Sequence, residues 1–181
     1  MKAIRFEKTG GPEVLQWVDV ELPPPAAGEV RLRLTAIGVN YIDTYHRSGL
    51  YPLPMPSGLG SEAAGVVLQL GAGVKGFKVG DRVAYGTGAQ NSYAQQCNIA
   101  AKHLVKIPKS ISDDTAAGMM LKGMTVRYLL CATYKVKRGQ TILLHAAAGG
   151  VGLILSQWAK SLGVKVIGTV GSAVKMQTAR R

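Results

Sequence analysis

The residues with the clearest chemistry form a glycine-rich segment in the second half of the 181-residue chain. The segment runs from Thr141 to Gly152 and reads Thr-Ile-Leu-Leu-His-Ala-Ala-Ala-Gly-Gly-Val-Gly, and apolar residues at helical spacing follow it as far as Leu162. A short apolar strand, a glycine turn and a helix are the parts of a dinucleotide-binding unit. In such a unit the free N–H groups at the positive end of the helix bind the pyrophosphate. The segment therefore predicts a bound dinucleotide.

Three positions of the segment correspond to the G-x-G-x-x-G fingerprint. The first falls on Ala147, a small residue that still permits a tight turn, and the other two fall on Gly149 and Gly152. Gly149 would let the backbone approach the pyrophosphate, and Gly152 would let the helix pack close to the strand. The alternative is a closely packed turn that binds nothing. The residues expected to contact the cofactor are Ala148, Gly149, Gly150, Val151 and Gly152.

The end of the next predicted strand indicates which dinucleotide is bound. The acidic residue that would bind the ribose 2′-hydroxyl of NAD, about twenty positions after the loop, is absent. After the predicted strand Val164–Val170 the chain instead reads Gly-Ser-Ala-Val-Lys, in which Ser172 can donate a hydrogen bond and Lys175 can supply a positive charge. These groups suit a 2′-phosphate, so we predict NADPH. The alternative for Lys175 is an ordinary exposed lysine at the start of a helix.

Composition and charge exclude several classes of protein. A hydrophobic content of 47% indicates a globular chain with a real core, and the two cysteines form neither a disulfide framework nor a zinc-ribbon pattern. The N-terminus does not resemble a signal peptide and no apolar run is long enough for a membrane span, so we expect a cytoplasmic protein. The formal net charge of +12 would attract a polyanion, either a dinucleotide or a nucleic acid. Because the basic residues are scattered without aromatic residues between them, a solvated basic surface is the simpler interpretation.

The elements that must position these residues change type near residue 112. Residues 1 to 112 are rich in strand-like runs and turns, which predicts an antiparallel barrel-like domain. From residue 113 onward, N-cap candidates around Ser112 precede a predicted helix that continues to Cys131. A strand–helix–strand unit follows and implies a parallel, right-handed pair. The chain ends at Arg181 inside the next predicted helix, and we expect a fragment of a longer protein. The predicted strands are Ala3–Phe6, Leu15–Val20, Val30–Val39, Ala64–Leu70, Arg82–Tyr85, His103–Lys106, Thr141–His145 and Val164–Val170.

Several motifs resemble the quinone oxidoreductase and zeta-crystallin branch of the medium-chain dehydrogenase/reductase family. The resemblance implies a β-barrel GroES-like domain over residues 1–112 and a partial α/β Rossmann domain over residues 113–181. Of the Rossmann domain, two parallel strands would be present and the remainder missing. The residues that carry the resemblance are Gly139, Gln140, Leu143, Ala147–Gly150, Gly152, Gln157, Lys160, Ala36–Asp43 and Gly58–Gly65.

The resemblance also implies a catalytic site. It places Asn40, Tyr45, Lys122 and Thr125 beside the nicotinamide, with Asn40 bonding the acceptor oxygen and Tyr45 stacking on or orienting a flat ring. The alternatives are a turn at a strand end for Asn40 and a packing aromatic for Tyr45. Lys122 lies in an apolar helical run, an unusual place for a cation unless it reaches a ligand or extends to the surface.

Departures from the zinc alcohol dehydrogenases of the same family point away from metal chemistry. Asn40 and Ser61 stand where those enzymes carry a zinc-binding cysteine and histidine, and the four-cysteine lobe is also absent, so we predict no metal. Glu62 remains as a structural carboxylate. Without a Lewis acid, we expect hydride delivery from NADPH to an electron-poor acceptor such as a quinone.

Several alternatives remain open. The same fold serves enoyl and alkenal reductases, which would take a conjugated enone, and quinone reduction can proceed by one-electron or two-electron steps. Two alternatives to an active enzyme are a nucleotide- or RNA-binding module without turnover and an inactive fragment. The resemblance implies a homodimer for the full-length form.

Overall fold

The computed structural model describes residues 1–88 and 90–180. It comprises two compact units, Met1–Leu121 and Lys122–Arg181, which we describe separately. The predicted domain boundary between residues 112 and 113 coincides with the start of helix α2 (Asp113–Tyr128), whereas the compact units part within that helix. None of the helices within the described residues combines the length and the apolar character that crossing a membrane requires.

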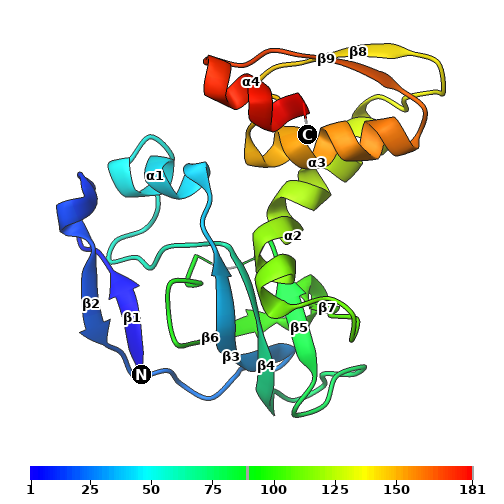
Figure 1. Ribbon diagram of the computed structural model, residues 1–181. Coiled ribbons are helices and arrows are strands. Elements are labelled where there is room, and N and C mark those ends of the chain that lie inside the picture. The colour runs from blue at the N-terminus through cyan, green and yellow to red at the C-terminus, as the bar shows by residue number, and fades with distance from the viewer. Residues whose placement is uncertain (89, 181) are drawn as a thin grey trace. The chain divides into compact units, whose positions relative to one another are not determined.

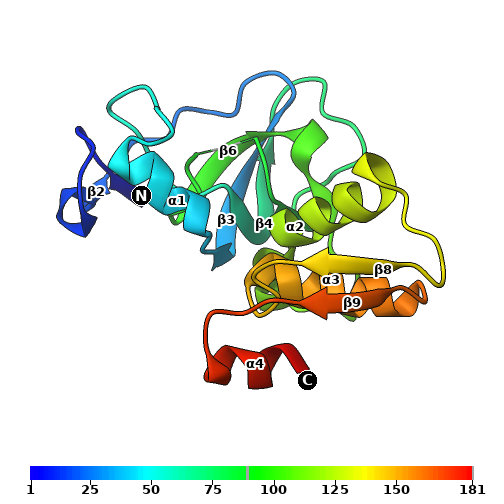
Figure 2. The same ribbon diagram turned by 90° about the horizontal axis from the view of Figure 1, so that it is seen from above.

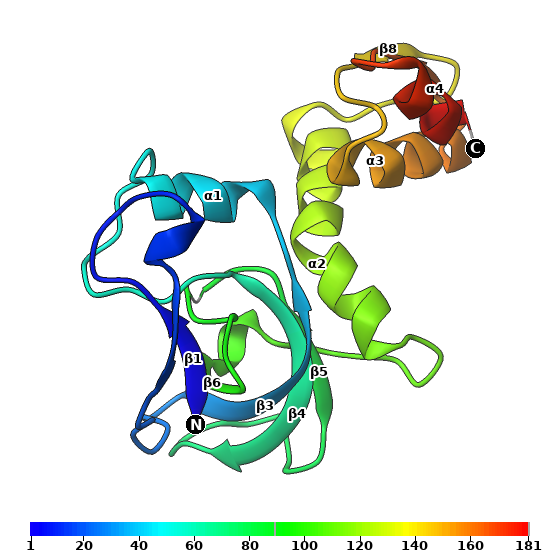
Figure 3. The ribbon, with the colours of Figure 1, turned by 60° about the vertical axis from the view of Figure 1, so that its left-hand side comes forward.

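The first unit is built on a five-stranded antiparallel sheet with the strand order β6-β3-β4-β5-β7. Its strands curve strongly, as the side view shows, and together they give the predicted barrel-like form (Figure 3). A separate antiparallel pair, β1-β2, is bridged to the rest of the unit through Ala3 and Ala94. The strands are β1 (Lys2–Arg5), β2 (Gln16–Asp19), β3 (Glu29–Gly38), β4 (Glu62–Leu70), β5 (Arg82–Tyr85), β6 (Gln96–Ala100) and β7 (Val105–Lys106).

Alternating side chains give this sheet its core. In β3, Val30 and Leu32 are fully buried while Arg31 and Arg33 are not, as expected for a strand with one wet face. The turn before β5 contains Gly80, whose φ of +90° lies in the left-handed region that favours glycine. The core residues of the sheet are Val30, Leu32, Ala63, Val67, Val83, Tyr85, Cys97, Ile99 and Leu104.

Two elements of the first unit were not predicted. Helix α1 (Tyr41–Ser48) has only eight residues, several of them aromatic or β-branched, so its intrinsic helix propensity is weak, although Asn40 and Asp43 at its start have the spacing of a capping pair. Strand β6 is short and begins with a polar residue, and its pairing with β3 determines it. The strand predicted from His103 is shorter than expected, because the 3₁₀ turn η2 (Ala101–His103) takes up its first residue. A second 3₁₀ turn, η1 (Pro12–Val14), precedes β2.

Helix α2 begins as predicted. The Ser112 hydroxyl accepts a hydrogen bond from the N–H of Thr115 at 3.1 Å, which caps the helix. Within the first unit, Ala116 and Ala117 of α2 pack against Ala64 and Ala84 of the sheet, and these small side chains allow a close approach. The α-helix ends at Tyr128, and the π-helical turn η3 (Leu129–Thr133) occupies the predicted last turn.

The second unit has the predicted strand–helix–strand order. Strands β8 (Thr141–Leu144) and β9 (Lys165–Gly168) are parallel and lie side by side along α3 (Gly150–Ser161), before the last helix α4 (Ala173–Arg180) (Figures 1 and 2). One face of this pair packs on helices, and Leu143 and Ile167 on the other face are 63% and 52% exposed. The core of the unit consists of Val126, Leu130, Leu155, Ala159 and Val164. Arg181, predicted to lie within the last helix, falls outside the described residues.

Candidate functional site

The predicted glycine-rich loop connects β8 to α3 through a tight turn. Its unusual backbone conformation falls on Ala146, whose φ is +53°. A left-handed alanine is uncommon and costs free energy, so the surrounding contacts must hold it in place. The N–H of Gly149 donates to the carbonyl of Ala146 at 2.8 Å, and the N–H of Ala147 donates to the carbonyl of Thr169 at 3.0 Å. Ala147, which replaces the first glycine of the fingerprint, has no left-handed φ, and so a glycine is not required there.

The start of α3 presents N–H groups that have no protein acceptor. The first intrahelical bond runs from Leu153 N–H to Gly149 C=O at 2.9 Å. The three preceding N–H groups, of Gly150, Val151 and Gly152, donate to no acceptor among the described residues, and no side chain caps this helix. Such groups at a helix N-terminus suit an anion.

A glycine is required at position 152 because backbone atoms occupy the space beside it, whereas the space beside Gly150 is occupied by the Lys122 side chain. A Cβ atom on Gly152 would lie 2.5 Å from the carbonyl oxygen of Ala146 and 2.6 Å from that of Ala147. A Cβ atom on Gly150 would lie 2.9 Å from Cδ of Lys122, so the aliphatic part of this lysine lies against the start of α3. Thr125 follows Lys122 by three residues, and both therefore lie on the same side of α2. The structure thus brings Lys122 together with the glycine loop.

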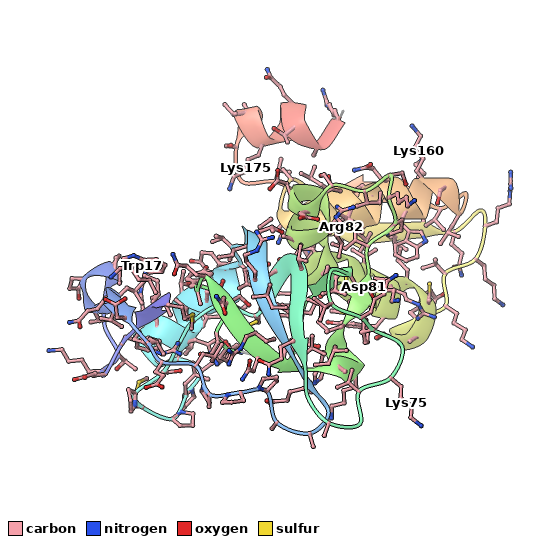
Figure 4. All side chains as sticks on the ribbon, turned by 90° about the horizontal axis from the view of Figure 1, so that it is seen from below. Trp17, Lys75, Asp81, Arg82, Lys160 and Lys175 are labelled. Atoms are coloured by element: carbon pink, nitrogen blue, oxygen red, sulfur yellow. The ribbon has the colours of Figure 1, made fainter. Side chains whose placement is uncertain are left out.

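Ser172 and Lys175 lie at the beginning of α4, shortly after β9. The Ser172 hydroxyl accepts a hydrogen bond from the N–H of Lys175 at 3.3 Å and caps the helix. Both residues are exposed, and Lys175 extends from the surface of the second unit, as does Lys160 on α3 (Figure 4). The second unit contains no Asp or Glu, because none occurs after Asp114. Its field therefore favours an anionic ligand.

Asn40, in the first unit, precedes α1 and is 8% exposed. Its side-chain nitrogen Nδ2 donates to Oε2 of Glu62 at 2.7 Å, and its backbone N–H donates to Oδ2 of Asp43 at 2.9 Å. The same Asp43 oxygen accepts the hydroxyl of Tyr93 at 2.8 Å. Burial, and then this hydrogen bond, raise the pKa of Tyr93 well above its ordinary value. The turn at Asn40, which was the alternative to a catalytic role, thus carries a buried polar network.

Tyr45, in the middle of α1, is half-buried among aromatic rings. Its ring centroid lies 5.3 Å from that of Tyr41 and 5.3 Å from that of Tyr51, in both cases edge to face. Tyr41 itself is 75% exposed. The group presents flat apolar surface of the kind that a planar ring packs against.

The role of Asp43 was not predicted, and Glu62 was predicted as a structural carboxylate without its partners. The spacing of Asn40 and Asp43 is that of a capping pair, and this signal could have identified Asp43 from the sequence. No comparable signal exists for Glu62, because its partners lie 22 and 59 residues away. Among the described residues, no group of three or more His, Cys, Asp or Glu side chains could hold a metal ion. The absence of a metal stays a prediction.

Comparison with known proteins agrees with this geometry. Residues 26–143, more than half of the chain, match the family described as "Alcohol dehydrogenase GroES-like domain". The chain belongs to this family. Its fold class is confirmed as a GroES-like barrel followed by part of an α/β Rossmann domain with two parallel strands. Members of the family differ in the acceptor named for them.

Three relatives illustrate the range. The chain is 55% identical over 181 residues to a quinone oxidoreductase of Pseudomonas aeruginosa, covering 99% of this chain and 56% of that protein. It is 48% identical over 182 residues to a 2-haloacrylate reductase of a Burkholderia species, covering 97% of this chain and 55% of that protein. The crystal structure of Escherichia coli quinone oxidoreductase complexed with NADPH matches with a TM-score of 0.97 at 54% identity, covering 99% of this chain and 56% of that one. The chain therefore spans about half the length of these relatives.

Proposed function

We propose that the protein is an NADPH-dependent oxidoreductase that reduces quinones without zinc. The observation that carries the proposal is the start of α3, where three N–H groups without a protein acceptor follow a glycine loop with Lys122 against it. Relatives of the chain are named quinone oxidoreductases, which supports a quinone as the acceptor. One of them was solved in complex with NADPH, which supports NADPH as the cofactor.

The residues present fit a dinucleotide phosphate. The backbone contacts at Gly152 leave no room for a side chain there, and Gly150 carries none, so the backbone at the start of α3 is not covered by side chains of these two residues. We propose that the N–H groups of Gly150 to Gly152, together with Ala148 and Gly149, bind the pyrophosphate. At the start of α4, Ser172 and Lys175 are proposed to bind the 2′-phosphate through a hydrogen bond and a charge.

The remaining candidate residues are proposed to orient the reactants. NADPH, when bound, supplies a hydride. Lys122 and Thr125 on one face of α2 are proposed to hold the nicotinamide end, through the charge of Lys122 and the hydroxyl of Thr125. Asn40 and the rings around Tyr45 are proposed to orient the acceptor. Holding reactants in one geometry removes much of the entropic cost of reaction.

The proposal excludes zinc on the chemistry of the donor set. At the positions that resemble the zinc-binding cysteine and histidine, the chain has Asn40 and Ser61, and both are poor zinc ligands. The side-chain amide of Asn40 also donates a hydrogen bond to Glu62. An acceptor that needs no Lewis acid, such as a quinone, therefore suits the site.

An activated alkene is the second candidate acceptor. The 48% identity to a 2-haloacrylate reductase favours it specifically. A conjugated alkene and a quinone both accept a hydride at an electron-poor carbon, so one site can serve either. We propose further that the protein acts in the cytoplasm and that its full-length form is a homodimer. The proposed boundary between the two domains lies at residue 112. RNA binding is a less favoured alternative to the proposed enzymatic function.

The proposal is tested by following the oxidation of NADPH by this chain through the absorbance of the reduced nicotinamide, with one quinone, one conjugated enone and one 2-haloacrylate. Quinone-dependent oxidation of NADPH that persists after exhaustive dialysis against a chelator is expected. Oxidation that requires the alkene substrates would transfer the assignment to alkene reduction. Loss of activity on chelation and recovery with Zn²⁺ would contradict the zinc-free proposal.

A further inference from the structure

Glu62 is a fully buried carboxylate at the beginning of β4. It is 0% exposed. Because an ionisable side chain is seldom fully buried without hydrogen-bond partners, donors are expected around it. Two donors to it come from distant parts of the first unit. The Nδ2 group of Asn40 donates to Oε2 at 2.7 Å, and the backbone N–H of Leu121 donates to Oε1 at 2.8 Å.

The surroundings of Glu62 leave it little freedom to move. A side chain at Gly38, the last residue of β3, would collide both with Oε2 of Glu62 and with the carbonyl oxygen of Ala117 in α2. The absence of a side chain at Gly38 therefore lets the sheet, the carboxylate and α2 pack closely. Glu62 is held between the strand that leads to Asn40 and the helix that leads to Lys122.

We infer that Glu62 is a positioning residue that fixes the amide of Asn40 for the proposed reaction. A carboxylate accepts hydrogen bonds and cannot donate them, so the nitrogen end of the Asn40 amide must face Glu62 and the oxygen end must face away. A neutral partner in the same place would tolerate both orientations, which differ by a half-turn of the amide. The negative charge of Glu62 thus selects one of the two orientations of the Asn40 amide. This inference rests on the proposed function of Asn40.

A second contact extends the effect to α2. Leu121 is followed directly by Lys122, so the bond from the Leu121 N–H ties Glu62 to the helical turn that carries a candidate cofactor residue. The backbone turn at Asn40 does not depend on Glu62, because the Asn40 N–H is held separately by Asp43. Removing the charge of Glu62 should therefore remove this constraint on the orientation of the Asn40 amide and leave the backbone of Asn40 in place.

The first experiment measures amide orientation without any enzymatic activity. In the ¹⁵N–¹H spectrum of the whole chain, the two side-chain protons of Asn40 should have widely separated shifts, because one of them is bound to a buried carboxylate. Glu62→Gln should reduce this separation or give two sets of signals. An unchanged pair of signals would overturn the inference. The Asn40 signals are assigned by their loss in Asn40→Ala.

The second experiment is a double-mutant cycle on kcat with a quinone, using Asn40→Ala, Glu62→Gln and the double variant. Loss of a hydrogen bond to a charged group corresponds to roughly 10- to 100-fold, so Glu62→Gln should lower kcat about that much when Asn40 is present. In the background of Asn40→Ala the same change should cost less than about 2-fold, because the group it positions is gone. Equal losses in both backgrounds would show that Glu62 does not act through Asn40.

Asp113→Asn provides the matched control. Asp113, at the start of α2, is also a carboxylate in the first unit, and it accepts hydrogen bonds from Thr35 and Arg82. It has no proposed role in binding. Asp113→Asn should lower thermal stability and leave kcat and the Asn40 signals unchanged. If Glu62→Gln does not fold, Glu62→Asp keeps the charge and should preserve the separation of the Asn40 signals, and loss of that separation would count against the inference. Wild-type protein that reduces no quinone would refute the proposed function, and the spectrum would still decide the orientation.

Discussion

Replacing Gly152 by alanine should damage the candidate pyrophosphate site through the backbone rather than through any lost side chain. The new Cβ atom would lie 2.5 Å from the carbonyl oxygen of Ala146 and 2.6 Å from that of Ala147, and both obstacles are backbone. Ordinary contact begins at 3.4 Å, so the loop or the helix must move by roughly 0.9 Å. We expect this strain to cost about 1–3 kcal/mol of folding stability, the usual range for overpacking.

The same movement should weaken cofactor binding. A hydrogen bond of ordinary length that is stretched by this much no longer counts as one. Loss of one bond to a charged phosphate corresponds to about 1.5–3 kcal/mol, or roughly a 10- to 150-fold rise in the Kd of NADPH. The Kd is measured by titrating the fluorescence of NADPH, and stability by thermal unfolding.

Gly118→Ala is the matched control for Gly152→Ala. Nothing lies within 4 Å of a Cβ atom at Gly118, which is in α2, so this change should leave the Kd unchanged and stabilise the chain by about 0.5–1 kcal/mol. If Gly152→Ala bound NADPH as tightly as the wild type, the N–H groups at the start of α3 would not be the pyrophosphate site.

Two further predictions concern titratable side chains. The Thr35 hydroxyl and the Arg82 guanidinium hold the pKa of Asp113 below its ordinary value, and a carboxyl group of this kind contributes stability above its unfolded pKa and loses it as the pH falls through its folded pKa. Asp113→Asn should therefore unfold more easily at neutral pH and show a shallower loss of stability below about pH 4, as measured by thermal unfolding across that range; an unaltered pH profile would contradict the assignment. Burial raises the pKa of the Cys97 thiol to about 11, so a thiol reagent at pH 8 should modify the half-buried Cys131 first and Cys97 only on unfolding, which mass spectrometry of digested protein can follow. Rapid labelling of Cys97 in the folded protein would show that its pocket opens.

The parts that could be predicted from the sequence are those whose signals are local. The strand before Gly149, the helix after it and the second strand each carry their own periodicity, and the structure has them within a few residues of the predicted bounds. Ser112 was identified as a cap for the same reason, because its partner Thr115 lies three residues away. Helix α1 is short and its residues have weak helix propensity, so its local signal is the capping pair of Asn40 and Asp43 rather than a long periodic pattern.

The candidate site divides in the same way. The glycine loop was predicted with its flanking elements, but the left-handed residue proved to be Ala146 rather than a position of the fingerprint. The polar network around Asn40 depends on Glu62 and Tyr93, which reach it from β4 and from the loop before β6. Contacts between distant segments arise from the folded barrel, so residue spacing could not disclose them.

The most direct test of the central claim is the preference for NADPH over NADH, measured as a ratio of Kd values before and after Lys175→Ala. If Ser172 and Lys175 bind the 2′-phosphate, removing the lysine should raise the Kd of NADPH by about 10-fold or more, as expected for a lost charged contact, and change that of NADH less than about 2-fold. Lys160→Ala, which removes an equally exposed lysine from α3 of the same unit, should change neither constant beyond a small effect of net charge. Equal losses for both cofactors, or no affinity for NADPH in the unaltered chain, would contradict the account.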